Sequence, residues 1–158
     1  MFSRAYIEIT NICNMSCSFC HGHSREPGIM NTEEFTRILE QLEGKTKYIY
    51  FHLMGEPLAH PEILKFISLA KERGFFPMIT TNGTLLGSWK DDLVRSGLHK
   101  VNVSLHSFEE GSREQHEAYM AQVCDFADKA SEAGTIVVIR LCNGLFHVNV
   151  IVALLSGG

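Results

Sequence analysis

The sequence predicts an α/β fold in which a parallel sheet of about five to six strands is flanked by helices. Two observations support this fold class. Short apolar runs alternate along the chain with longer amphipathic segments, which is typical of strands joined by crossover helices in a parallel sheet. The apolar runs are nearly continuous, as expected for strands that are buried on both faces. This pattern alone fits both a flat doubly wound sheet and a curved partial barrel.

Five strands and four helices account for the pattern. The expected strands span residues 4–10, 47–54, 75–80, 99–106 and 135–141. The expected helices begin near Asn31, Pro61, Leu86 and Ser112 and stop at Gly44, Gly74, Gly97 and Gly134. Each stop is a glycine, the residue that most readily adopts the left-handed conformation found at helix ends.

The first expected helix shows its signals most completely. Asn31 at its start and Glu34 three residues later predict a capping box, in which each side chain bonds the other residue's backbone N–H. Its apolar residues recur at the spacing of one helical face, namely Phe35, Ile38, Leu39 and Leu42.

The tail, residues 142–158, is mostly apolar and ends in Ser-Gly-Gly. We expect it to form a sixth strand or a stub of helix. A sixth full strand–helix unit and a separate substrate-binding region do not fit in this length. We therefore interpret residues 1–158 as a single core domain and suspect that its carboxyl end is incomplete.

Composition and charge narrow the function classes. The net charge is −4, so the chain lacks the broad basic surface expected of a nucleic-acid-binding protein. Arg4 and Glu8 interrupt the first apolar stretch, so no signal peptide is expected. No run of about 18 apolar residues predicts a membrane span. Clustered thiols without a secretion signal fit the reducing cytoplasm.

The stretch that points to chemistry is Cys13-Asn-Met-Ser-Cys17-Ser-Phe-Cys20, which follows the first expected strand. Thiolates are soft ligands that suit iron–sulfur clusters, zinc or copper(I). Three protein ligands leave one metal position open for a substrate or cofactor. The alternatives are three unrelated cysteines, or one disulfide and a spare thiol. Because cysteines so close together in a loop rarely belong to a core, we interpret all three as metal ligands.

The Cys-x3-Cys-x2-Cys spacing, with Phe19 just before the last cysteine, resembles the signature of the radical S-adenosylmethionine (radical SAM) enzymes. The lead-in Glu8-Ile-Thr-Asn-Ile-Cys13 is similar to that of many members. The resemblance implies that the cysteines hold a 4Fe–4S cluster and that the amino and carboxylate groups of S-adenosylmethionine (SAM) chelate its fourth iron. It also implies that Phe19 lies beside the adenine, and it favours a partial (β/α)6 barrel.

A second part of the resemblance follows the second expected strand. Met54-Gly55-Glu56-Pro57 is similar to the family's Gly-Gly-Glu-Pro motif, with Met54 in place of the first glycine. The resemblance implies that Gly55 and Glu56 meet the amino group of SAM. Gly55 would allow a close approach of backbone to ligand, and Pro57 would fix the turn. The alternative is an ordinary turn before a helix.

Two polar residues end the third and fourth expected strands. Asn82, in Thr80-Thr81-Asn82-Gly83, resembles a Thr-Asn-Gly stretch that lines the family's cofactor or substrate pocket; the same residues also fit a plain strand-to-helix turn. Ser104 lies on the polar face of its strand, and polar groups on a buried strand need partners. The resemblance places Ser104 near the ribose or carboxylate of SAM.

Arg140 ends the fifth expected strand, where an unpaired charge would be costly. Arginine binds carboxylates in a two-pronged contact, so its partner is the methionine carboxylate of SAM, or else Glu8 or Glu56.

Several other residues lie near the expected site without an assigned role. They are His21 and His23 beside the cysteines, His52 and His106 at strand ends, and Cys142 as a candidate reactive thiol. No catalytic acid, base or substrate-binding residue is assigned.

These observations predict a radical SAM enzyme. In that reaction a reduced cluster cleaves SAM to methionine and a 5′-deoxyadenosyl radical, which abstracts hydrogen from an unidentified small-molecule or peptide substrate. The low potential required implies a flavodoxin- or ferredoxin-like electron donor. Two alternatives stay open. One is a non-catalytic iron–sulfur or zinc protein, against which the missing fourth cysteine argues; the other is an inactive truncated remnant.

Overall fold

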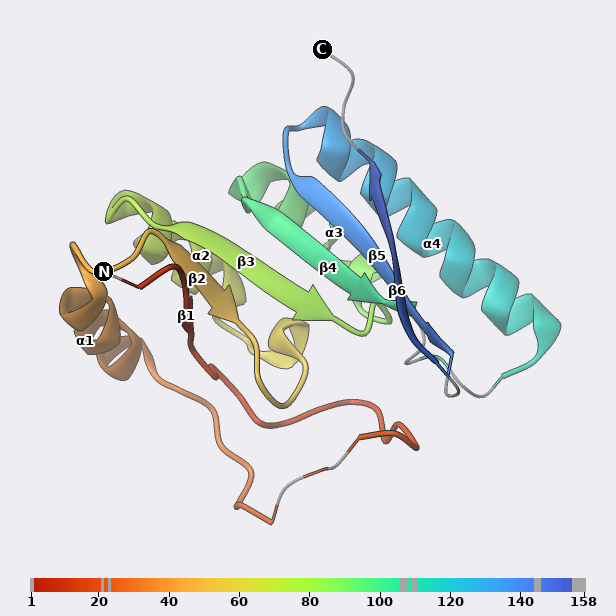
Figure 1. Cartoon of the computed structure of the whole chain (residues 1–158), viewed down its shortest axis with the longest axis horizontal. Coiled ribbons are helices and arrows are strands. Elements are labelled where there is room, and N and C mark those ends of the chain that lie inside the picture. Colours follow the sequence, from red (N-terminus) through yellow and green to blue (C-terminus); the bar gives the residue numbers. More distant parts are fainter. Residues whose placement is uncertain are drawn as a thin grey trace. The chain divides into compact units, whose positions relative to one another are not determined.

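The computed structural model describes residues 2–20, 22, 24–105, 108, 111–143 and 146–154, with side chains described through Leu141. Contacts divide the chain into two compact units, Met1–Thr80 and Thr81–Gly158. Each unit contains parallel strands and flanking helices (Figure 1). None of the described helices is long and apolar enough to cross a membrane.

The first unit is built on three parallel strands. In chain order its elements are β1 (Ala5–Tyr6), α1 (Thr32–Leu42), β2 (Tyr48–Phe51), the short 3-10 helix η1 (Pro57–Ala59), α2 (Ile63–Glu72) and β3 (Phe76–Thr81). Strand β2 pairs with β1 and with β3. Its Ile49 and Phe51 are fully buried and alternate with the more exposed Tyr48 and Tyr50, which is the predicted period of two.

Three fully buried phenylalanines form the centre of this unit's core. The ring of Phe35 in α1 stacks on Phe66 in α2 with ring centroids 4.2 Å apart, and it meets Phe51 in β2 edge-on at 5.4 Å. The cluster therefore holds α1 and α2 against the same face of β2. Helix α1 follows the connection that carries the three cysteines, and α2 follows the turn after β2, so the cluster anchors both segments (Figure 1).

The start of α1 confirms the predicted capping box. The side chain of Asn31 accepts a hydrogen bond from the backbone N–H of Glu34 at 2.9 Å, and the Glu34 carboxylate accepts one from the Asn31 N–H at 2.9 Å. Two backbone donors that the helix leaves unpaired are thereby satisfied.

Strand β1 is shorter than the strand predicted over residues 4–10. The N–H of Ile7 still donates to the carbonyl of Tyr50, but Ile9 accepts instead from Met30, and Thr10 forms an antiparallel bridge with Ile29. The chain leaves the sheet here because its backbone groups pair with the returning arm of the cysteine-containing connection.

The second unit contains two parallel strands and one antiparallel strand. Its elements are α3 (Leu86–Ser96), β4 (Lys100–Ser104), α4 (Arg113–Glu132), β5 (Ile136–Asn143) and β6 (Phe146–Leu154). Strand β4 runs parallel to β5. Lys90 of α3 and Asp125 of α4 form an ion pair at 2.5 Å that ties these helices together.

The tail forms a strand, the first of the two expected possibilities, but β6 runs antiparallel to β5. Only residues 144 and 145 separate the two strands, and so short a connection joins antiparallel neighbours. The described parallel pairs are therefore β1–β2 and β2–β3 in the first unit and β4–β5 in the second, and the parallel pattern ends before the tail.

The phenylalanine cluster generates a stability prediction. Phe35→Ala should lower the free energy of unfolding by about 3–5 kcal/mol, because it removes a fully buried ring and leaves a cavity. Urea unfolding followed by circular dichroism measures this loss. Ile38→Ala, at a half-buried position of the same helix, is the matched control and should cost clearly less. Equal losses in the two variants would contradict this account of the core.

Candidate functional site

The three cysteines lie in the long connection between β1 and α1, of which residues 11–28 are called the cysteine loop below. None of the three thiols is in a disulfide; Cys13 and Cys20 are exposed, and Cys17 is half-buried. The N–H of Cys20 donates to the carbonyl of Cys17 at 3.1 Å, and the N–H of Gly22 points at the Cys20 sulfur at 3.4 Å.

The structure does not bring the three sulfurs to one point. Within the described part of the chain, no three histidine, cysteine, aspartate or glutamate side chains are grouped closely enough to hold a metal ion. The donor set nevertheless fits an iron–sulfur cluster, because three reduced, accessible thiols in one loop are the ligands that such clusters take. His21 and His23 lie outside the described residues.

The base of the cysteine loop is closed by hydrogen bonds between its two arms. Thr10 donates its hydroxyl to the carbonyl of Gly28 at 3.0 Å. Asn11 donates its amide to the carbonyl of Glu26 at 2.9 Å and accepts from the N–H of Gly28 at 2.7 Å. These neutral bonds hold the arms together at the point where the chain leaves β1.

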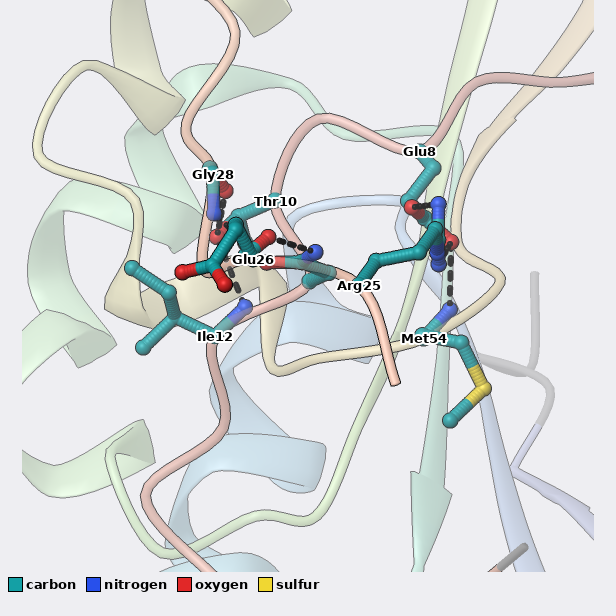
Figure 2. Close-up of polar contacts among 8 residues, drawn as sticks. Glu8, Thr10, Ile12, Arg25, Glu26, Gly28 and Met54 are labelled. Carbon is teal, nitrogen blue, oxygen red and sulfur yellow. Dashed lines mark hydrogen bonds and ion pairs between the residues drawn. The ribbon is translucent and has the colours of Figure 1, made fainter. Parts of the chain in front are cut away.

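An ion pair that the sequence did not reveal joins the returning arm to the end of β1. The guanidinium of Arg25 meets both carboxylate oxygens of Glu8, at 2.6 and 3.1 Å, and Glu8 also accepts from the N–H of Met54 at 3.2 Å (Figure 2). The hydrogen bond to Glu8 raises the pKa of Arg25, although desolvation opposes it. The carboxylate of Glu8, which follows β1, thus connects this segment with the cysteine loop and the turn after β2.

The turn after β2 lies directly against the start of the cysteine loop. Gly55 has a φ of 76°, and a Cβ there would lie 2.7 Å from the carbonyl oxygens of both Thr10 and Ile12. The N–H of Glu56 donates to the carbonyl of Ile12 at 2.8 Å. The close approach expected of Gly55 therefore exists, and it is made to the backbone of the loop.

The Glu56 side chain has a structural role in this turn. It is 1% exposed, and its Oε1 accepts from the N–H of Leu58 at 3.0 Å, which caps η1. Pro57 is the first residue of η1, as the expected turn before a helix requires.

In the second unit, Asn82 forms the turn predicted for it. Its side-chain oxygen accepts from the N–H and the hydroxyl of Thr84, at 3.0 and 2.7 Å. Its carbonyl accepts from the hydroxyl of Tyr119 at 2.7 Å, so α4 holds the turn from behind. Gly83 follows with a φ of 81°, and a Cβ there would meet Tyr119.

Ser104 and Arg140 are direct partners in the register of β4 and β5. Both are half-buried; Ser104 ends β4, but β5 continues past Arg140 to Asn143, so Arg140 does not end its strand as expected. The structure therefore brings these two predicted residues together. The carboxylate of Glu8, one of the partners considered for Arg140, binds Arg25.

The remaining predicted residues are less informative. Phe19 lies in the cysteine loop and is 48% exposed. His52 is half-buried, with its ring centroid 6.5 Å from that of Tyr6. His106 and the side chain of Cys142 fall outside the described residues.

Sequence reasoning missed the residues that hold these segments in place, among them Arg25, Tyr119 and His60. His60 is fully buried; its Nδ1 accepts from the N–H of Glu62 at 3.1 Å, so its Nε2 is the nitrogen that donates to the carbonyl of Met30, at 2.9 Å. Their partners are up to 37 positions away, and no local motif marks them.

Comparison with solved structures gives the same fold. SuiB of Streptococcus suis, solved with S-adenosylmethionine and also with its precursor peptide SuiA, matches at a TM-score of 0.64 and 23% identity. The match covers 86% of this chain and 33% of the SuiB chain. This likeness confirms the predicted fold class, a parallel α/β sheet of the partial-barrel type.

Curated relatives match part of the chain. The tungsten-containing aldehyde ferredoxin oxidoreductase cofactor-modifying protein of Pyrococcus furiosus is 41% identical over 85 residues, which is 51% of this chain and 24% of that protein. A probable GTP 3′,8-cyclase of Sulfurisphaera tokodaii is 33% identical over 107 residues, 65% of this chain and 34% of the cyclase. The chain thus spans about a quarter to a third of their length.

The family comparison covers most of the chain. The sequence profile of the Radical SAM superfamily matches residues 7–150, a range that includes the cysteine loop, the turn after β2 and the ends of β3, β4 and β5. The resemblance inferred from the cysteine spacing is confirmed, and with it the 4Fe–4S cluster and SAM that this superfamily uses. The chain belongs to the radical SAM superfamily.

Proposed function

We propose that this chain is the catalytic core of a radical SAM enzyme in which Cys13, Cys17 and Cys20 hold a 4Fe–4S cluster. The observation that carries the proposal is the set of three reduced thiols in one loop with a closed base, against which the Gly55-Glu56 turn is packed. When bound, the cluster and SAM supply reductive cleavage of the sulfonium and hydrogen abstraction from substrate.

The residues of the first unit have separate tasks in this proposal. The loop exposes Cys13 and Cys20 and half-buries Cys17, and the closed base keeps the two arms from separating. The backbone of Gly55 and Glu56 offers polar groups to the amino group of SAM beside the loop. Phe19, exposed in the loop, offers a flat apolar surface for the adenine.

In the second unit, Asn82, Ser104 and Arg140 are the proposed polar contacts to the cofactor. Arg140 is the proposed partner of the methionine carboxylate, because a guanidinium binds a carboxylate with two parallel hydrogen bonds. Ser104, its register neighbour, is the proposed donor to the ribose or the same carboxylate. Asn82 is proposed to meet the cofactor from a turn whose position is held by the hydrogen bond from Tyr119.

The partners and the compartment are part of the proposal. Reductive cleavage takes a low-potential electron, so a flavodoxin- or ferredoxin-like donor is required. A reducing compartment such as the cytoplasm fits thiols that are not in disulfides at Cys13, Cys17, Cys20 and Cys124. The substrate is an unidentified small molecule or peptide.

Reconstitution with iron and sulfide under anaerobic conditions tests the cluster. The chain should bind about four irons and show an electron paramagnetic resonance spectrum that changes on adding SAM. Cys17→Ser should lose most of the iron, because two sulfurs hold the cluster poorly. Cys124→Ser removes an exposed thiol on α4 and should bind iron normally. A spectrum indifferent to SAM would identify an electron carrier instead of an enzyme.

The Gly55 contact gives a second test. Gly55→Ala should lower the free energy of unfolding and the iron content, since its methyl group would strike the carbonyl oxygens of Thr10 and Ile12. Gly74→Ala is the matched control: its φ is 79°, but no atom lies within 4 Å of the added Cβ. Both variants lose about 1–2 kcal/mol from the left-handed backbone.

Only Gly55→Ala has the further loss of stability that comes from steric overlap, because no atom lies within 4 Å of a Cβ added at Gly74. Denaturant unfolding and iron analysis of both variants separate it from the backbone part. If Gly55→Ala and Gly74→Ala lose the same stability and retain the same iron, the turn is not packed against the loop as described.

A further inference from the structure

The contact between Glu8 and Arg25 differs from the other ion pairs of the first unit. The two residues lie 17 positions apart on either side of the three cysteines, and the guanidinium makes two hydrogen bonds to the carboxylate. The Glu8 side chain is 17% exposed, whereas that of Arg25 is 56% exposed. By contrast, Arg37 and Glu33 pair across one helical turn through a single contact, and both side chains are mostly exposed.

The geometry of this pair makes its contribution to stability larger than that of an ordinary surface ion pair. Exposed pairs contribute little because water and salt screen them, whereas a two-pronged contact to a mostly shielded carboxylate is screened less. The pair also ties Arg25 to Glu8 in addition to the neutral bonds at Glu26 and Gly28, so breaking it loosens the part of the loop that precedes Glu26. Figure 2 shows Arg25 extended toward Glu8, with dashed lines joining both the Arg25 guanidinium and the Met54 nitrogen to the Glu8 carboxylate.

The third partner extends the effect beyond the loop. Glu8 accepts from the N–H of Met54, the residue directly before Gly55. The carboxylate is therefore fixed by the returning arm of the cysteine loop on one side and by the start of the Gly55-Glu56 turn on the other. A displacement of Arg25 is transmitted to this turn through a single side chain.

We propose that Glu8 and Arg25 are positioning residues that couple the cysteine loop to the Gly55-Glu56 turn. Their ion pair sets the resting position of the loop, and through Met54 it aligns the turn that meets the cofactor. The inference rests on the proposed function for the cofactor's place, but the closure of the loop by this pair can be tested without any cofactor.

The first experiment uses the chain without iron. Chymotrypsin cleaves after aromatic residues such as Phe19, which lies inside the loop, and its recognition does not depend on Arg25 or Glu8. Arg25→Gln and Glu8→Gln should each be cleaved at Phe19 about tenfold faster than the unmodified chain, because the loop opens more often. Arg37→Gln, which breaks the helical pair, should be cleaved at the unmodified rate.

The double variant separates a pair from two independent effects. If Glu8 and Arg25 act through each other, Glu8→Gln/Arg25→Gln is cleaved no faster than the faster single variant. Independent effects would multiply to about a hundredfold, and that result overturns the proposal. Arg25→Lys keeps the charge but not the two-pronged geometry, so its rate should fall between those of the unmodified chain and Arg25→Gln.

The second experiment tests the coupling to the turn. In the reconstituted protein, Arg25→Gln should still bind iron, but about tenfold more SAM should be needed to produce the spectral change.

An unchanged SAM titration overturns the coupling even if the loop is cleaved faster. Cleavage at the unmodified rate overturns the loop closure. An unmodified chain whose spectrum ignores SAM refutes the proposed function, and the cleavage rates then still decide on the closure of the loop.

Discussion

The arrangement of the candidate site depends on one backbone contact, the approach of Gly55 to the carbonyl oxygens of Thr10 and Ile12. No side chain fits in this space, since a Cβ would lie 2.7 Å from either oxygen. The contact makes one surface from two segments that are more than forty positions apart in the sequence. The Phe35, Phe51 and Phe66 rings support this contact, because they anchor the helices that follow the two segments.

Two kinds of interaction hold the cysteine loop, and they respond differently to the solvent. The bonds of Thr10 and Asn11 to the returning arm are neutral, so salt leaves them largely unchanged. The pair between Glu8 and Arg25 is charged, and salt weakens it to the extent that water reaches it. Salt therefore affects the contact of Arg25 with Glu8 more than it affects the neutral bonds at the base of the loop.

Local patterns predicted most of the fold. The capping box of Asn31 and Glu34, the alternation in β2 and the α/β order all follow from residues close together in the sequence. The shortened β1 and the antiparallel β6 were not predicted, because they depend on pairing with distant segments or on a short connection. Apolar patterns record which face is buried, and they do not record the direction or the partner of a strand.

The residues of the candidate site also divide into those that local motifs predicted and those that they did not. The cysteine spacing and Gly55 were visible because each is a local motif. Arg25 and Tyr119 were not, since their partners come from other elements of the fold. The proposed ligands Cys13, Cys17 and Cys20 do not converge within the described part of the chain, so on the proposed function their final geometry is set when the metal binds.

The outward placement of the thiols has a cost before any iron is bound. Two of them are open to solvent, so dissolved oxygen and peroxide reach their sulfur atoms as easily as iron does. Oxidation to a sulfenic acid, or a disulfide between neighbours such as Cys17 and Cys20, would remove ligands proposed for the cluster. Oxidation by air therefore competes with iron binding at these thiols. The newly made chain must bind iron, or be kept reduced, before its thiols are oxidised.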